Sequence, residues 1–125
     1  MRSEHWTAEL MIMEDEAERL LMVAVEKFHA RVEEDKKLKE AVEGMNKEIR
    51  IQFRDDGSWG LTLSCGRLSP PRRAEDEGDI TVITDTETLK GILDEELNPI
   101  VAYVRGRIKV RGKVEDLLAL KALLK

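Results

Sequence analysis

The chain has 125 residues with a formal net charge of −5, and 42% of its residues are hydrophobic. This length predicts one domain over residues 1–125 with a sizeable core, and the acidic balance excludes a globally basic nucleic-acid binder. No apolar run approaches the roughly 20 residues of a membrane span, and the N-terminus lacks a secretion signal. The single cysteine, Cys65, excludes an internal disulfide framework. We therefore expect a cytoplasmic protein.

Residues 8–33 have the periodicity of one long amphipathic helix. Its apolar stripe consists of Leu10, Met13, Ala17, Leu20, Leu21, Ala24, Val25, Phe28 and Val32. A second apolar group, near the opposite face, consists of Met11, Ile12, Met22 and Val23. We favour partial cover of this group by the N-terminal segment, and a self-association surface is the alternative. A shorter helix is predicted over residues 35–45, with Asp35 as its N-cap.

A β-hairpin follows the two helices. Apolar and polar residues alternate over 48–54 and again over 59–65, with a glycine-containing turn at 55–58 between them. Cys65 continues the alternation of the second strand, so we interpret it as a core residue rather than a nucleophile. Residues 66–78 contain two adjacent prolines and allow only brief edge pairing.

The remaining elements alternate between strands and helices. Residues 80–84 are apolar on both sides, which indicates an interior strand, and Asp85 is placed to cap the helix that follows. A short helix is predicted from Ile100 to Val104, then a strand over 107–111 and a final helix over 114–124. The final helix is apolar on nearly every side, so it must be covered by a second element, another subunit or an apolar ligand.

Catalytic equipment is sparse in this sequence. The only histidines are His5 and His29, and there is no zinc-ligand spacing, nucleophile elbow, phosphate-binding loop or dinucleotide fingerprint. We therefore expect no enzymatic activity of its own, no metal site and no cofactor.

Basic side chains occupy every second position near the C-terminus. These are Arg105, Arg107, Lys109, Arg111 and Lys113. We favour a solvated strand face offset by the abundant carboxylates, and transient contact with lipid phosphate or an anionic membrane is the alternative. Because no aromatic residue interleaves the stripe to stack on bases, we expect no nucleic-acid partner.

The run from residue 79 to 112 carries a specific motif. After the strand and the helix at Asp85 come Leu97-Asn98-Pro99, Ala102-Tyr103 and residues 106–112, Gly-Arg-Ile-Lys-Val-Arg-Gly. This resembles, without a gap, the pattern L-N/D-P-x-x-A-F/Y-x-x-G-K/R-L/I-K-I/V-x-G of the SCP2 (sterol carrier protein 2-like) lipid-binding family. The upstream elements extend the resemblance over residues 15–125, although residues 68–73 are richer in proline than the family's third strand.

The resemblance implies an α+β fold, with a five-stranded mixed sheet covered by helices and an apolar tunnel between sheet and helices. It implies a non-catalytic carrier of a sterol, fatty acid, acyl group or similar apolar ligand. The alternatives are a protein-interaction or homodimerisation module with the tunnel filled, and an accessory domain of a lipid-metabolising enzyme.

Alternation and helix phase predict which residues line such a tunnel. They are Phe53, Leu61, Val82, Ile92, Val101, Val104, Ile108, Leu117, Leu120 and Leu124. Arg105 and Arg107 are the candidates for contact with a lipid head group or a membrane surface.

Overall fold

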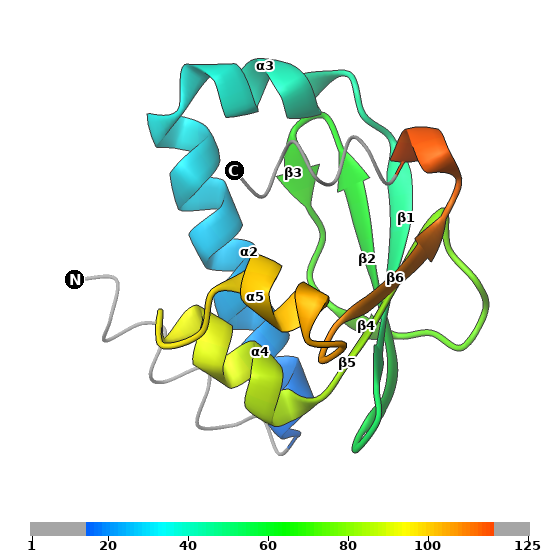
Figure 1. Cartoon of the computed structure of the whole chain (residues 1–125). Helices are drawn as coiled ribbons and strands as arrows, with labels where there is room; N and C mark the ends of the chain where they lie inside the picture. Colours follow the sequence, from blue (N-terminus) through cyan, green and yellow to red (C-terminus); the bar gives the residue numbers. More distant parts are fainter. Residues whose placement is uncertain (1–14, 117–125) are drawn as a thin grey trace.

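The computed structural model describes residues 15–116, in which helices cover one face of a mixed β-sheet (Figure 1). The helices are α2 (Glu16–Glu34), α3 (Lys36–Glu43), α4 (Thr86–Leu93) and α5 (Pro99–Val104). The strands are β1 (Lys47–Phe53), β2 (Gly57–Ser64), β3 (Arg67–Leu68), β4 (Arg72–Arg73), β5 (Ile80–Thr84) and β6 (Lys109–Gly112). Within these residues, no helix is both long and apolar enough to cross a membrane.

The strand order is β3-β2-β1-β5-β6, and β4 also pairs with β2. The β1–β5 pair is parallel, whereas β1–β2, β2–β3 and β5–β6 are antiparallel. Pro70 and Pro71 separate β3 from β4, so the edge position beside β2 is filled by two short pieces. The predicted α+β class, with a mixed sheet of five strand positions, is confirmed.

Helix ends follow the capping residues that the sequence offers. The Asp35 side chain accepts a hydrogen bond from the Leu38 N–H (3.1 Å), and the Asp85 side chain accepts one from the Thr88 N–H (2.8 Å). Asp15 acts in the same way on the Ala17 N–H (3.0 Å) and is itself extended. The prediction of one helix over residues 8–33 was therefore wrong at Asp15, because α2 begins directly after this N-cap; residues 8–14 lie outside the described part.

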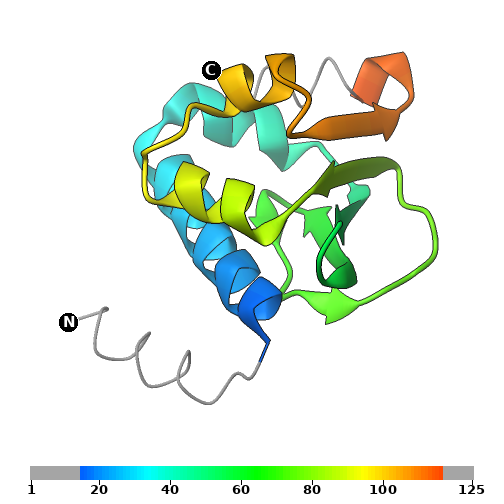
Figure 2. The same cartoon turned by 60° about the horizontal axis from the view of Figure 1, so that its bottom comes forward.

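One apolar cluster joins α2 to the sheet, and a second joins α2 to α3. Ala17 and Leu21 of α2 pack with Phe53 and Trp59, and Val32 packs with α3 in a second cluster. Figure 2 shows α2, α4 and α5 on the same side of the sheet. Of the second apolar group predicted on the first helix, Met22 and Val23 are half-buried, and Met11 and Ile12 lie outside the described residues.

Cys65 is exposed, so its interpretation as a core residue was wrong. Strand β2 ends at Ser64, and both Cys65 (φ 53°) and Gly66 (φ 77°) are left-handed. These two residues form the tight turn into β3, and two positive φ values suit such a hairpin turn. The turn ends the strand alternation, and the thiol faces solvent.

The strand predicted over residues 107–111 begins later, at Lys109. Gly106 (φ 79°) terminates α5, and the Arg107 N–H donates to the Ala102 carbonyl at 2.9 Å. Arg107 is thus part of a helix-ending turn. Of the predicted basic stripe, only Lys109 and Arg111 lie on a strand, so a single extended basic face was wrong.

Candidate functional site

One face of the sheet is built almost entirely of apolar side chains, because strand pairing aligns the inward positions of four strands. Trp59, Ile51, Val82 and Val110 are successive partners across β2, β1, β5 and β6. Leu61, Ile49 and Ile80 form the next row. Successive residues of a strand point to opposite faces, so both rows lie on the face that α2 covers. We call this the inner face.

Cover over the inner face is uneven. Trp59 and Leu61 on β2 are buried beneath the helices, with exposed fractions of 4% and 5%. Val82 on β5 and Val110 on β6 are only half-buried. Ile80, the other inward residue of β5 named above, is only 1% exposed, so the apolar wall that the described residues leave partly uncovered is the row through Val82 and Val110.

The predicted tunnel residues fall into four groups. Phe53 and Leu61 are buried on the inner face, and Val82, Ile92 and Ile108 are half-buried. Val101 and Val104 lie on the surface of α5 with 39% and 77% exposed. Leu117, Leu120 and Leu124 lie outside the described residues. That any of them lines a tunnel stays a prediction.

The start of the predicted final helix lies against the sheet. Residues 114–116 are helical, and the buried carboxylate of Asp116 pairs with the Lys47 ammonium on β1 at 2.6 Å. Lys47 is the inward-facing partner of Leu63. The chain therefore returns to the inner face just before residue 117.

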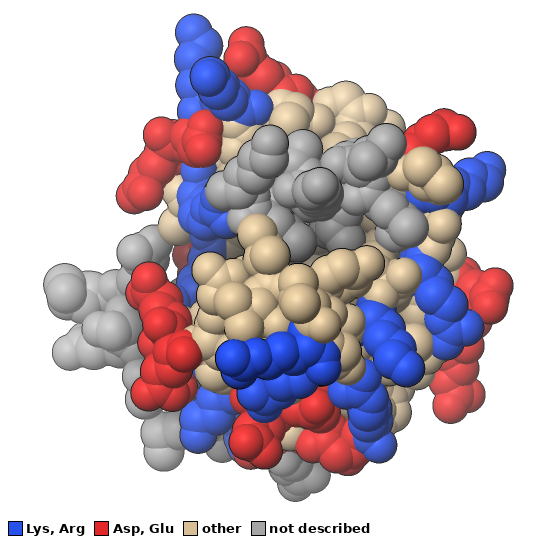
Figure 3. All heavy atoms as spheres, in the orientation of Figure 1, with Lys and Arg blue, Asp and Glu red and all other residues tan. Residues whose placement is uncertain are grey.

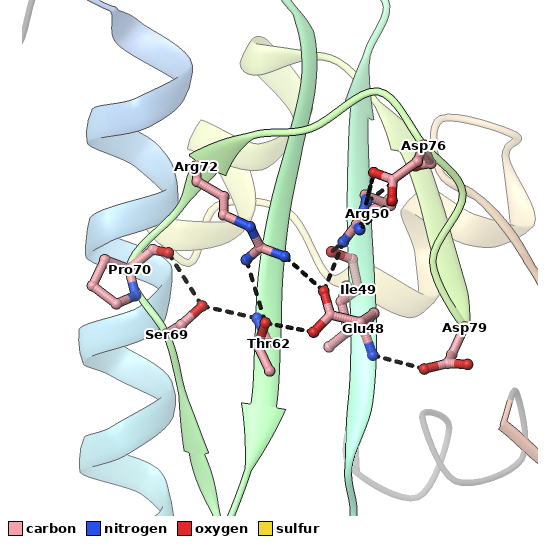
Figure 4. Close-up of polar contacts among 9 residues, drawn as sticks. All are labelled: Glu48, Ile49, Arg50, Thr62, Ser69, Pro70, Arg72, Asp76 and Asp79. Atoms are coloured by element: carbon pink, nitrogen blue, oxygen red, sulfur yellow. Dashed lines mark hydrogen bonds and ion pairs between the residues drawn. The ribbon is translucent and has the colours of Figure 1, made fainter.

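The opposite face of the sheet carries a polar network instead (Figure 4). Arg50 is only 4% exposed, and its Nε donates to the Asp76 carbonyl oxygen at 3.0 Å. Glu48 accepts from the Arg50 Nη1 (3.1 Å), the Arg72 Nη2 (2.7 Å) and the Thr62 hydroxyl (2.6 Å). The hydrogen bonds from Thr62 and Arg72 lower the pKa of Glu48 to about 2. An apolar ligand therefore has only the inner face available in this sheet.

His29 lies beside a surface hollow of about 250 Å³. Its Nε2 accepts a hydrogen bond from the Leu68 N–H at 3.0 Å, which links α2 to β3 and requires an unprotonated ring nitrogen. Burial, followed by the positive charge of Arg67, lowers the pKa of His29. The exposed thiol of Cys65 lines the same hollow.

The lowered pKa of His29 predicts lower stability in mild acid. Below the unfolded value of about 6.5, the unfolded chain binds a proton that the folded chain resists, so the free energy of unfolding falls as the pH decreases from there. We expect His29→Gln, whose amide oxygen accepts the same hydrogen bond, to flatten this dependence. Urea unfolding of both proteins at pH 7.5 and 5.5 measures the free energy of unfolding. An equal decrease in both proteins between the two pH values would contradict the assignment of this pH dependence to His29.

Sequence reasoning missed that α5 presents apolar side chains to solvent. Besides Val101 and Val104, Ile100 is 53% and Tyr103 57% exposed, and only Ala102 of this helix is buried. A signal was available in Pro-Ile-Val-Ala-Tyr-Val, because a six-residue helix that is apolar at every position cannot bury all its sides in a small domain.

Comparison with known proteins identifies the domain type. The family model of the "SCP-2 sterol transfer family" matches residues 25–125. Stomatin-like protein 1 of Mus musculus is 36% identical over 67 residues, which cover 52% of this chain and 16% of that protein.

Solved structures show the same fold. The palmitated SCP2L2 of Aedes aegypti has a TM-score of 0.58 at 18% identity and is covered over 91% of its chain by 82% of this one. A sec-alkylsulfatase from Pseudomonas sp. has a TM-score of 0.53 at 26% identity, with 70% of this chain covering 13% of the enzyme. The chain thus spans about one sixth of the curated relative and a smaller share of the sulfatase.

Proposed function

Since the chain belongs to the SCP-2 sterol transfer family, we propose that it is a non-catalytic, cytoplasmic carrier that holds an apolar lipid against its inner face. The proposed wall comprises Phe53, Leu61, Val82, Ile92 and Ile108 of the described residues. We also propose that Leu117, Leu120 and Leu124 of the predicted final helix contact the lipid. Val101 and Val104, 39% and 77% exposed, stay predicted members of the wall at its open edge.

The single observation that carries this proposal is the uneven cover of the inner face. Helix α2 buries Trp59 on β2, whereas in the same row of partners Val82 and Val110 are only half-buried within the described part of the chain. Apolar wall without full cover is what a binding site for an alkyl chain requires. The polar network around Arg50 closes the other face to such a ligand.

Hydrophobic burial alone supplies adequate affinity. A 16-carbon chain gains about 0.8 kcal/mol per buried CH₂, or roughly 13 kcal/mol gross. Ordering the chain and losing rigid-body freedom cost about half of this. The remainder corresponds to a Kd on the order of 10 µM without a specific polar contact. Because burial is non-directional, we expect weak discrimination among lipids of similar length.

Two buried polar atoms are candidates for the polar end of the ligand. The indole Nε1 of Trp59 and the hydroxyl of Thr88 are buried and have no hydrogen-bond partner in the described part of the chain. Buried donors are rarely left unpaired. A carboxylate or hydroxyl group on the lipid would provide the missing acceptor at either position.

Lipids bound to the purified native protein test this function directly. We expect native mass spectrometry to detect a stoichiometric fatty acid or similar lipid, and the delipidated protein to bind a fluorescent 16-carbon fatty acid. This chain length matches the palmitated Aedes aegypti neighbour. A delipidated protein that stays folded, takes up no fatty acid and forms a dimer in light scattering would replace the carrier with the interaction module.

An accessory role to an enzyme is a second candidate function, favoured by the small share of the sulfatase chain that this domain matches. This chain matches only 13% of the Pseudomonas sec-alkylsulfatase, so the fold also occurs inside a much larger enzyme. In this role the domain would present its lipid to a catalytic partner. Co-purification of a lipid-metabolising enzyme whose turnover rises with the loaded domain would support it; a rate unaffected by loading would exclude it for that enzyme.

A further inference from the structure

We propose that α5 and the turn after it dock on an anionic lipid membrane. The α5 surface is defined as Ile100, Val101, Tyr103, Val104, Arg105 and Arg107. This proposal rests on the proposed function for its purpose, since a carried lipid must be exchanged with a membrane. Docking itself is a separate physical property and is measured separately below.

The apolar part of the α5 surface is concentrated on one short helix. Its four apolar members are exposed by between 39% and 77% of their surface. Figure 3 shows this region as an area without charged side chains, with Lys and Arg bordering it below and on the right and Asp and Glu on the left. Clustered exposed apolar groups with a polar rim are typical of a protein or membrane contact.

The charged part distinguishes a membrane from other occupants. Arg50, Arg54, Arg72 and Arg73 each pair with a carboxylate. Within residues 15–116, no carboxylate forms an ion pair with any of the basic residues at positions 105, 107, 109, 111 and 113. This cluster of free positive charge beside α5 matches the phosphate groups of an anionic membrane.

A second copy of the chain fits this surface less well. A two-fold dimer contacts the same patch on both subunits, so α5 would meet α5. Arg105 and Arg107 of one copy would then lie close to those of the other, and like charges oppose such an interface. The chain carries a net charge of −5, so only a local basic face allows close approach to an anionic bilayer.

Two side-chain hydrogen bonds to the Arg107 carbonyl hold the α5 surface next to the half-covered part of the inner face. The Thr84 hydroxyl, at the end of β5, donates to the Arg107 carbonyl at 3.2 Å, and the Arg54 Nη1 donates to the same carbonyl at 3.2 Å. Docking through α5 would therefore place the β5–β6 side of the domain, with Val82, close to the bilayer.

Flotation of the full chain with lipid vesicles tests the docking. We expect the chain to float with phosphatidylcholine vesicles containing 30% phosphatidylglycerol, weakly with pure phosphatidylcholine, and several-fold less in 0.5 M salt. Val104→Asp and the double variant Arg105→Glu/Arg107→Glu should each lower the bound fraction at least fivefold. Lys36→Glu/Lys37→Glu, on the exposed side of α3, changes the net charge equally and should retain binding.

Equal flotation of all variants, or equal binding to neutral and anionic vesicles, would overturn the proposal. The proposal would also be overturned if the chain never floats but forms a dimer that Val104→Asp dissociates. In that case the α5 surface would bind a second copy of the chain. Fatty-acid uptake in vesicle-free solution is measured on the same proteins. Vesicle binding without uptake would support docking and contradict the proposed function, and uptake without vesicle binding would do the reverse.

Discussion

Val82→Phe lowers the affinity for a 16-carbon fatty acid at least tenfold and leaves the domain folded, if the inner face holds the ligand. Val82 lies between Ile51 and Val110 on the half-covered side of this face. A phenyl ring there occupies space that the alkyl chain would need. A mismatch of this kind typically costs about 1–3 kcal/mol, and 1.4 kcal/mol corresponds to tenfold in Kd. Titration of the delipidated protein with a fluorescent fatty acid measures the change.

The adjacent residue provides a matched control. Ile83 lies on the same strand, is also half-buried and points to the opposite face, where its strand partners are Gln52 and Lys109. Ile83→Phe adds a ring at almost the same place in the chain but outside the proposed site, so its Kd should change by less than about twofold. Equal losses in both variants would indicate a general effect on folding, and unchanged affinity in Val82→Phe would remove β5 from the site.

Local rules sufficed for most of the architecture. The resemblance of the run from Leu97 to Gly112 to the SCP2 family implied the fold class, and the alternation in the hairpin predicted its two faces. Capping residues such as Asp35 and Asp85 determine where helices begin, and they act within one turn of themselves. The predictions from capping and alternation were confirmed because each depends on neighbours in sequence.

The errors have a common physical cause, which is that an element's end depends on the turn beyond it. Cys65 continues the strand alternation in sequence, yet the left-handed turn with Gly66 removes it from the strand. Arg107 belongs to the turn that ends α5, so the predicted strand starts too early. Turn geometry of this kind is set by few residues and has a weaker signal than periodicity.

The burial of Arg50 could not be predicted from its strand. Alternation correctly places it on the polar face, where an arginine is ordinarily solvated. It is buried because residues 74–79, which we call the strap, run from β4 to β5 across the outer face of the sheet (Figure 4). A Cβ on Gly78 would lie only 2.6 Å from the Glu48 carbonyl oxygen, so glycine allows this close approach.

Arg50→Ala should lower the free energy of unfolding by about 2–3 kcal/mol, the typical effect of removing a buried, multiply hydrogen-bonded charge. The guanidinium holds the strap through the Asp76 carbonyl and carboxylate (3.0 and 3.1 Å) and binds Glu48 on its own strand. Without it, the middle of the strap loses its connection to β1, and the hydrogen bonds between Asp79 and the Glu48 backbone (2.7 and 2.8 Å) remain at its end. Urea unfolding measures the stability, and limited proteolysis within the strap should become several-fold faster.

Arg54→Ala is the matched control, because Arg54 directly follows β1 and pairs with Asp85 at 3.2 Å while remaining exposed. Exposed pairs contribute about 1 kcal/mol or less, so equal losses in the two variants would contradict a special role for the strap. The network around Arg50 lies on the face opposite the proposed site. Arg50→Ala should therefore change stability with little effect on fatty-acid affinity, whereas Val82→Phe should do the opposite. That opposition would separate the face that stabilises the domain from the face that binds.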